Sequence, residues 1–185
     1  ALPISLHISL LGENQLKNAA LVLEVLEILK KEGWNISRDA TSRGLAEARW
    51  PARFEIVSRS PWFVVDGGHN PQGTETVVRN LENYFSRMHT ILLVGVLRDK
   101  DYSRMMDILA PAADGFVTVT PGNPRALPAE ELAKLLEKYG KPVTACPSIR
   151  EGIEAAMSAA GPGGVVCSAG SLYMAGEVRA YFGLA

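Results

Sequence analysis

The 185-residue sequence lacks most features that mark specialised classes of protein. Its two cysteines, Cys146 and Cys167, lie in apolar stretches without metal-ligand or disulfide spacing, which indicates reduced thiols in a core. The 19 basic and 20 acidic residues leave a net charge of -1, so the clustered positive charge of nucleic-acid-binding proteins is missing. No apolar run approaches the ~20 residues of a membrane span, and no secretion signal occurs. We therefore expect a cytoplasmic protein with no nucleic-acid or membrane partner.

Several signatures of catalysis are also missing. No G-x-x-x-x-G-K-[ST] phosphate loop occurs, since the Gly140-Lys141 pair is followed by proline. His7, His69 and His89 are not spaced as zinc ligands, and there is no G-x-S-x-G nucleophile turn. The sequence therefore predicts no metal site within this chain and does not favour a free-standing ATP-using enzyme.

From about residue 54 onward, short apolar runs alternate regularly with amphipathic stretches. Strands are expected at Phe54–Val57, Trp62–Val65, Ile91–Val94, Phe116–Val119, Val143–Cys146 and Val165–Cys167. Helices are expected at Thr74–Phe85, Tyr102–Leu109, Glu130–Tyr139, Ile149–Ala159 and Ser171–Phe182. This order predicts an α/β fold with a Rossmann-like, mostly parallel sheet and helices on both faces. The first two strands are close in sequence and could pair as an antiparallel hairpin at the edge.

The first fifty residues follow a different pattern. Leu16–Leu29 predicts a helix that is apolar around most of its circumference, although little nearby sequence could cover it. A second helix is expected at Arg38–Ala46 with Ser37 as its cap, and Pro51 then interrupts the pattern. We therefore place a boundary there and expect residues 1–50 to be a helical remnant of an upstream domain and residues 51–185 to be a complete domain. A chain that starts at Ala1 rather than at methionine agrees with a fragment.

The most informative segment is 62–73, in which an apolar strand is followed by Asp66 and two glycines. Open α/β sheets bind their ligands at the carboxyl ends of strands, where Asp66 is expected. Asn70 and Pro71 predict a helix cap and a first helical position, and a helix start attracts anions. His69 could donate a hydrogen bond to the same ligand. The alternative is that Asp66 and His69 only hold the turn by local hydrogen bonds.

Other candidate residues are weaker when each is considered alone. Arg53 precedes the first strand and could be a solvated surface charge. Asn18 is a polar residue in the very apolar first helix, so burial would require a partner in a domain interface or a ligand. The segments 99–101 and 168–173 follow predicted strands, but charged loops are common, and a tight turn with Ser171 near the helix start explains the second segment better than a ligand site does.

Five motifs occur in a fixed order along the chain: GENQLKNAA at 12–20, PARFE at 51–55, DGGHNP at 66–71, GVLRDKD at 95–101 and GSLY at 170–173. Together they resemble the carboxyl-terminal third of the folylpolyglutamate synthase/dihydrofolate synthase family, which belongs to the Mur ligase superfamily. The resemblance covers essentially the whole chain. It implies that residues 1–50 end a central ATPase domain and that residues 51–185 form the carboxyl-terminal, glutamate ligase domain.

The resemblance implies an ATP-dependent acid–amino acid ligase that uses ATP and Mg2+. Such a ligase phosphorylates a carboxylate of dihydropteroate or a folate glutamate tail, and the amine of L-glutamate attacks the acyl phosphate. Asn18, Arg53 and Asp66 match residues of the nucleotide site, and His69 matches the motif's histidine near the reacting phosphate or the glutamate. The phosphate loop and magnesium ligands of the family lie upstream, so the resemblance implies that this chain alone is inactive. It also implies that the parent enzyme is a monomer.

Two positions depart from the family pattern. Asn14 stands where the family usually has histidine, and Asp-Gly-Gly-His replaces Asp-Gly-Ala-His at residues 66–69. The open alternatives are a non-catalytic, Rossmann-like nucleotide- or anion-binding module, another Mur-type amino acid ligase, and a scaffold that docks through its first helix. The sequence also leaves open whether the parent enzyme performs dihydrofolate synthesis, polyglutamation or both.

Overall fold

A computed structural model describes residues 5–184, and it divides into two compact units, with the boundary between Pro51 and Ala52. The first unit contains two helices, α1 (Glu13–Lys31) and α2 (Arg38–Glu47). As expected, Ser37 caps α2, since its hydroxyl accepts a hydrogen bond from the Ala40 amide at 3.0 Å. The two units are described separately.

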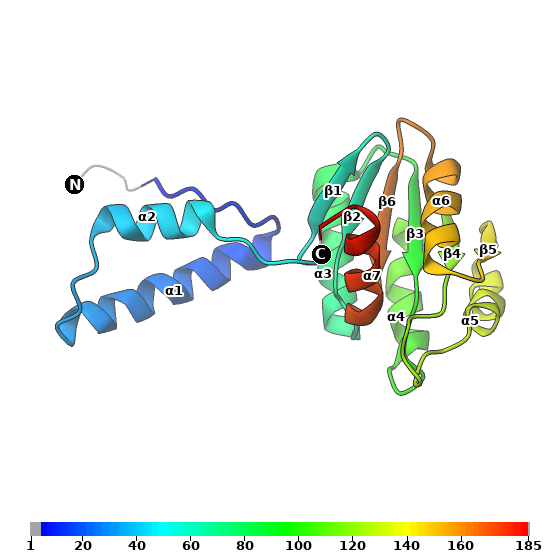
Figure 1. Ribbon diagram of the computed structural model, residues 1–185, viewed down its shortest axis with the longest axis horizontal. Helices are drawn as coiled ribbons and strands as arrows, with labels where there is room; N and C mark the ends of the chain where they lie inside the picture. The colour runs from blue at the N-terminus through cyan, green and yellow to red at the C-terminus, as the bar shows by residue number, and fades with distance from the viewer. Residues whose placement is uncertain (1–4, 185) are drawn as a thin grey trace. The chain divides into compact units, whose positions relative to one another are not determined.

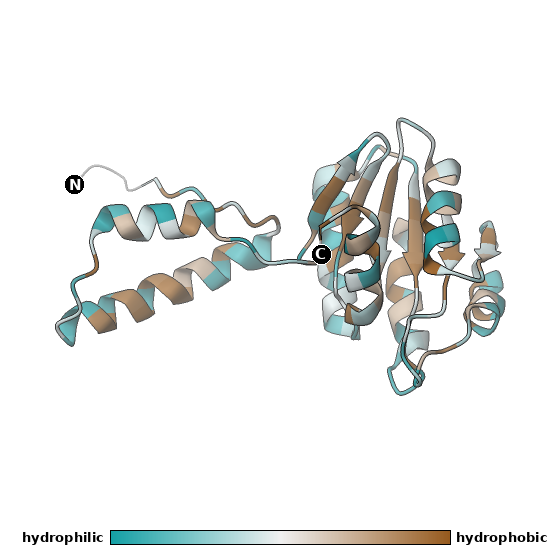
Figure 2. Cartoon of the chain, in the orientation of Figure 1, coloured by the Kyte–Doolittle hydropathy of each residue, from teal (hydrophilic) through white to brown (hydrophobic). Residues whose placement is uncertain are grey.

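The apolar side chains of α1 are largely exposed in the first unit. Figure 2 shows the apolar character of this helix, and Leu16, Leu21 and Ile28 retain 62%, 66% and 57% of their accessible surface. Exposure of this kind was expected, because too little of this sequence is available to cover so apolar a helix. Within residues 5–184, no helix combines the length and apolarity that crossing a membrane requires.

The second unit is a six-stranded sheet with strand order β1-β2-β6-β3-β4-β5 (Figure 1). The strands are β1 (Glu55–Arg59), β2 (Trp62–Val65), β3 (Thr90–Val94), β4 (Gly115–Thr118), β5 (Val143–Ala145) and β6 (Val165–Ala169). The helices are α3 (Pro71–Phe85), α4 (Tyr102–Leu109), α5 (Ala129–Leu136), α6 (Ile149–Ala160) and α7 (Leu172–Tyr181), with short 3-10 turns η1 (Ala110–Ala112) and η2 (Glu137–Tyr139). Only β1 runs antiparallel to its neighbour, and the other pairings are parallel. The prediction of a mostly parallel α/β sheet with an antiparallel edge hairpin is confirmed.

Helices cover both faces of this sheet. Figure 1 shows α6 and α7 on one face and α3 and α4 on the other. Strands β3 and β6 are buried along their whole lengths, as is typical of near-continuous apolar runs in a covered parallel sheet. One predicted helix is shorter than expected, because the segment predicted as Glu130–Tyr139 tightens into η2 and ends at Gly140, whose φ is +65°.

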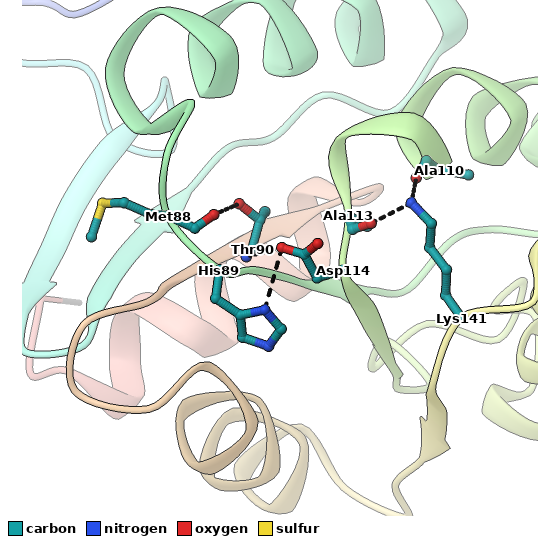
Figure 3. Close-up of polar contacts among 7 residues, drawn as sticks. All are labelled: Met88, His89, Thr90, Ala110, Ala113, Asp114 and Lys141. Carbon is teal, nitrogen blue, oxygen red and sulfur yellow. Dashed lines mark hydrogen bonds and ion pairs between the residues drawn. The ribbon is translucent and has the colours of Figure 1, made fainter.

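Polar contacts fix the amino-terminal edge of the sheet, opposite the edge where ligands are expected (Figure 3). Asp114 Oδ2 accepts a hydrogen bond from the Thr90 amide at 2.8 Å and lies 3.3 Å from His89 Nδ1. Lys141 Nζ donates to the carbonyl of Ala110 at 2.6 Å, at the junction of α4 and η1. These contacts close the turns between strands and helices. None of the residues predicted as ligand contacts lies at this edge.

Candidate functional site

The turn after β2 is held together by the buried carboxylate of Asp66. Asp66 Oδ1 accepts a hydrogen bond from the Gly68 amide at 2.7 Å, and Oδ2 accepts one from the Phe54 amide at 2.9 Å. The side chain is 8% exposed and lies where β2 ends, beside β6. Asp66 therefore links its own turn to the segment that carries Arg53. This agrees with the alternative in which Asp66 holds the turn by local hydrogen bonds.

Opposing effects act on the ionisation of Asp66. Burial raises the pKa of its carboxyl above the ordinary value of 3.8, because a charge is poorly solvated in the protein interior. The amides of Gly68 and Phe54 and the positive charge of Arg53 lower the pKa, and burial outweighs them. A buried carboxyl at the carboxyl end of a strand is typical of a ligand site, but buried structural carboxyls show the same shift.

His69 and the start of α3 follow directly. His69 Nδ1 lies 2.9 Å from the carbonyl oxygen of Gly67, and a carbonyl only accepts hydrogen bonds. Nδ1 therefore carries the proton, which leaves Nε2 as an acceptor in the neutral ring. Asn70 caps α3 by accepting from the Gly73 amide at 2.7 Å, and Pro71 occupies the first helical turn, as predicted.

A cavity of about 120 Å³ opens at the amino end of α7. Its wall combines His69 with residues of three other loops: Leu97, Lys100, Arg125, Gly170, Ser171, Leu172 and Tyr173. The Gly170 amide donates to the Gly68 carbonyl at 2.9 Å, so the turn after β6 and the turn after β2 are joined directly. Two cationic side chains and a helix start make this cavity suitable for an anionic ligand.

Arg125 is held in the cavity wall by its neighbours. Its guanidinium Nη1 lies 2.9 Å from Asp99 Oδ2, and its amide donates to Asn123 Oδ1 at 2.9 Å. The Arg98 amide donates to the Arg125 carbonyl at 2.8 Å, which pairs the loop after β3 with the loop after β4. Arg125 was not among the residues predicted from the sequence. Its position in the loop that follows a predicted strand was the one available signal.

Ser171 and Lys100 had only weak support from the sequence, and the structure places both in the cavity wall. Ser171 is 2% exposed and caps α7, accepting a hydrogen bond from the Tyr173 amide at 3.2 Å. Lys100 belongs to the charged segment after β3. No group of three or more histidine, cysteine, aspartate or glutamate residues within 5–184 is arranged to hold a metal ion.

Arg53 is exposed between two buried residues, Ala52 and Phe54. Both neighbours are in the left-handed region, with φ of 55° and 48°. The Arg53 guanidinium makes no hydrogen bond or ion pair with any residue that the structure describes, although its charge acts on Asp66. The structure therefore brings Arg53 close enough to Asp66 for its charge to act on that carboxyl, and the Arg53 side chain is exposed.

Asn18 lies in the first unit and is exposed in this chain. Its Nδ2 donates to Gln15 Oε1 at 2.9 Å, and the side chain stays exposed. The physical reason is that the flank of α1 carrying Asn18 has little protein packed against it, and an intrahelical partner three residues away satisfies the amide. Gln15 is the buried polar residue of this helix, at 7% exposure.

Comparison with known proteins identifies the family. The model of the Mur ligase glutamate ligase domain matches residues 52–172. The folylpolyglutamate synthase of Lacticaseibacillus casei is 34% identical over 176 residues, which cover 94% of this chain and 40% of that protein. The crystal structure of Mycobacterium tuberculosis folylpolyglutamate synthase complexed with ADP and AMPPCP is similar with a TM-score of 0.87 and 31% identity, over 96% of this chain and 42% of that one.

Escherichia coli FolC in complex with DHPP and ADP is similar with a TM-score of 0.84 and 27% identity, over 96% of this chain and 41% of that one. The chain thus spans about two fifths of the length of these relatives. The five ordered motifs, the sheet topology and the family match agree. The chain belongs to the Mur ligase family, where it corresponds to the carboxyl-terminal portion of folylpolyglutamate synthase/dihydrofolate synthase.

Proposed function

We propose that this chain is the amino-acid-binding part of an ATP-dependent ligase that adds L-glutamate to dihydropteroate, to a folate polyglutamate, or to both. In this proposal residues 1–50 end the upstream ATPase domain, which is the partner of residues 51–185 in a cytoplasmic, monomeric enzyme. The acceptor carboxylate is activated as an acyl phosphate, and the glutamate amine displaces phosphate to form the amide. The chain by itself is inactive, because the phosphate loop and the ligands of Mg2+ belong to the upstream part.

The observation that carries the proposal is the cationic cavity at the start of α7. Lys100 and Arg125 supply positive charge, and the amino end of α7 supplies a further partial positive charge. L-Glutamate carries two carboxylates, so one can lie at the helix start beside Ser171 while a cationic side chain binds the other. A neutral amino acid of similar size would make only the first of these two contacts, whereas Arg125 would keep its ion pair with Asp99.

The proposed target of His69 is the glutamate amine. Its Nδ1 proton is held by the Gly67 carbonyl, so Nε2 of the neutral ring is the atom that can accept a proton. Glutamate enters as an ammonium ion and attacks only after it has lost a proton. We propose His69 as the residue that accepts this proton or orients the amine, as a general base with a fixed tautomer.

The phosphate side of the reaction is assigned to Arg53, with Asp66 behind it. Arg53 is an exposed cation beside the turn of Asp66, with no ion-pair partner within residues 5–184, and a planar guanidinium suits phosphate oxygens. Both carboxylate oxygens of Asp66 accept hydrogen bonds from backbone amides, so Asp66 contributes to nucleotide binding by holding the turns around Arg53. Asn18 is proposed to contact the nucleotide from the ATPase domain.

Ligand binding to the chain tests the cavity directly. We expect L-glutamate to perturb the NMR signals of residues around the cavity in the 185-residue chain, and L-glutamine to bind at least about tenfold more weakly, since it lacks the side-chain charge. Arg125→Gln and Lys100→Gln should reduce this preference. Arg43→Gln changes a cation of α2 and serves as the matched control. Equal binding of glutamate and glutamine would contradict the proposal.

Catalysis is tested in a chimera in which this chain replaces the matching portion of the Lacticaseibacillus casei synthase. We expect glutamate-dependent ADP release from the chimera, and none from this chain alone. The main alternative is a non-catalytic nucleotide-binding module. Tight ATP binding by the isolated chain, without any selectivity for glutamate, would support that alternative instead.

A further inference from the structure

The segment around Arg53 has an unusual backbone. Ala52 and Phe54 both have positive φ, at 55° and 48°, although neither is glycine. A side chain makes this left-handed conformation unfavourable, so such residues persist only where the surrounding structure holds them. Two such residues flank the exposed Arg53, so their backbone conformation determines where the Arg53 side chain leaves the main chain.

Three hydrogen bonds hold this turn. The Ala52 amide donates to Glu55 Oε2 at 2.8 Å, and the Phe54 amide donates to Asp66 Oδ2 at 2.9 Å. The Ala52 carbonyl accepts from the Gly67 amide at 2.8 Å. Each residue that flanks Arg53 therefore donates its amide to a different carboxylate.

Side-chain packing fixes the direction of Arg53. Ala52 is 6% exposed and Phe54 is 1% exposed, and the Phe54 ring packs against the rings of Tyr84 and Phe85, with centroids 5.9 and 6.2 Å away. Because the residues on either side point into the protein, the side chain between them points outward. Packing of Ala52 and Phe54 therefore fixes the orientation of the turn, with the Arg53 side chain toward solvent.

Glu55 is itself anchored by α7. Its Oε2 lies 2.9 Å from Arg179 Nε, and the two side chains are only 26% and 20% exposed. The charge of Glu55 is therefore balanced by Arg179, so it does not neutralise Arg53. Helix α7 begins after Ser171 at the cavity described above, and Arg179 near its carboxyl end anchors Glu55 and so the turn around Arg53.

We propose that Glu55, anchored by Arg179, is a positioning residue that holds the left-handed turn at Ala52 and so keeps the Arg53 guanidinium in place for a phosphate-bearing ligand. The choice of ligand rests on the function proposed above, whereas the positioning itself rests on the geometry of the turn. Glu55 acts through Arg53 and touches no ligand.

The test uses the 185-residue chain and two NMR readouts. The amide signals of Ala52 and Phe54 report the turn, and a titration with tripolyphosphate followed at the Arg53 Nε–Hε signal reports the cation. Glu55→Ala should shift both amide signals and weaken tripolyphosphate binding at least about threefold. Glu55→Gln, which keeps an acceptor oxygen for the Ala52 amide, should stay close to wild type. Unchanged amide signals of β3 and β6 establish that each variant is folded.

A second substitution separates positioning from simple electrostatics. Loss of a negative charge near Arg53 would by itself make both Glu55 variants bind tripolyphosphate more tightly and equally. Adding Ala52→Gly to Glu55→Ala should restore binding, because glycine adopts positive φ without strain. The proposal is overturned if Glu55→Ala leaves the Ala52 and Phe54 signals unchanged or binds more tightly. If wild type does not bind tripolyphosphate at Arg53, the phosphate role of Arg53 fails, while the amide signals still decide the positioning.

Discussion

Asp66→Asn tests the claim that one buried carboxylate organises the site. The carboxylate accepts from two amides, those of Phe54 and Gly68, with one oxygen each. Asparagine has the same shape but only one acceptor oxygen, so its NH2 group must face one of these amides. Loss of a hydrogen bond to a charged acceptor costs about 1.5–3 kcal/mol. Removal of a buried charge offsets part of this, since burial disfavours the ionised form of the Asp66 carboxyl and raises its pKa. We expect a net loss of about 2 kcal/mol in the free energy of unfolding.

Urea unfolding of the second unit measures this loss. Trp34 and Trp50 are each 64% exposed, so replacing them with phenylalanine leaves Trp62 of β2 as the fluorescence probe for the sheet. Asp114→Asn is the matched control. It accepts from the Thr90 amide with one oxygen and is about half exposed, so asparagine can keep that bond and the loss should stay below about 1 kcal/mol. The reasoning is refuted if Asp66→Asn loses less than about 0.5 kcal/mol, or no more than Asp114→Asn.

Three further outcomes are expected. Gly170→Ala should lower the free energy of unfolding by about 2 kcal/mol or more, because φ is +111° there and a Cβ would lie 2.7 Å from a backbone carbonyl oxygen. Gly163→Ala is the control in the same urea titration, and it should be nearly neutral because the space around Gly163 is open. Ser171→Ala should lower the free energy of unfolding by about 1 kcal/mol, because it removes the cap of α7. It should also weaken L-glutamate binding, and unchanged binding would mean that the ligand lies away from the helix start. Because burial raises the pKa of Asp66 above 3.8, its stabilising contribution is complete below that pH and is lost as the pH rises through the folded-state pKa. The stability difference between wild type and Asp66→Asn should therefore narrow from about pH 3 to about pH 7, and a widening gap would contradict the direction of the shift.

The sequence predicted the fold through local patterns. Apolar runs such as Ile91–Val94 become strands buried on both faces, and the caps at Ser37 and Asn70 form as predicted, because each depends on a few neighbouring residues. Local patterns were less reliable where a turn tightens, as at Glu137–Tyr139, since the same residues fit an α-helix or a 3-10 turn. The burial of Asn18 could not be predicted from the sequence for a related reason, because burial depends on what covers α1 and not on α1 itself.

The candidate site divides in the same way. By itself the sequence determined that Asp66, the glycines and His69 lie in a turn after a strand, because that turn is built from consecutive residues. Only the tertiary structure decided that His69 shares a cavity with Lys100, Arg125 and Ser171, and that these four residues come from four separate loops. Parallel strands bring their carboxyl ends to one edge of the sheet, whatever their separation in the chain, so the pattern of one segment cannot show which loops meet. The left-handed turn around Arg53 was hidden for the same reason, since the groups that hold it, Asp66 and the Arg179-anchored Glu55, are brought together by strand pairing and by α7.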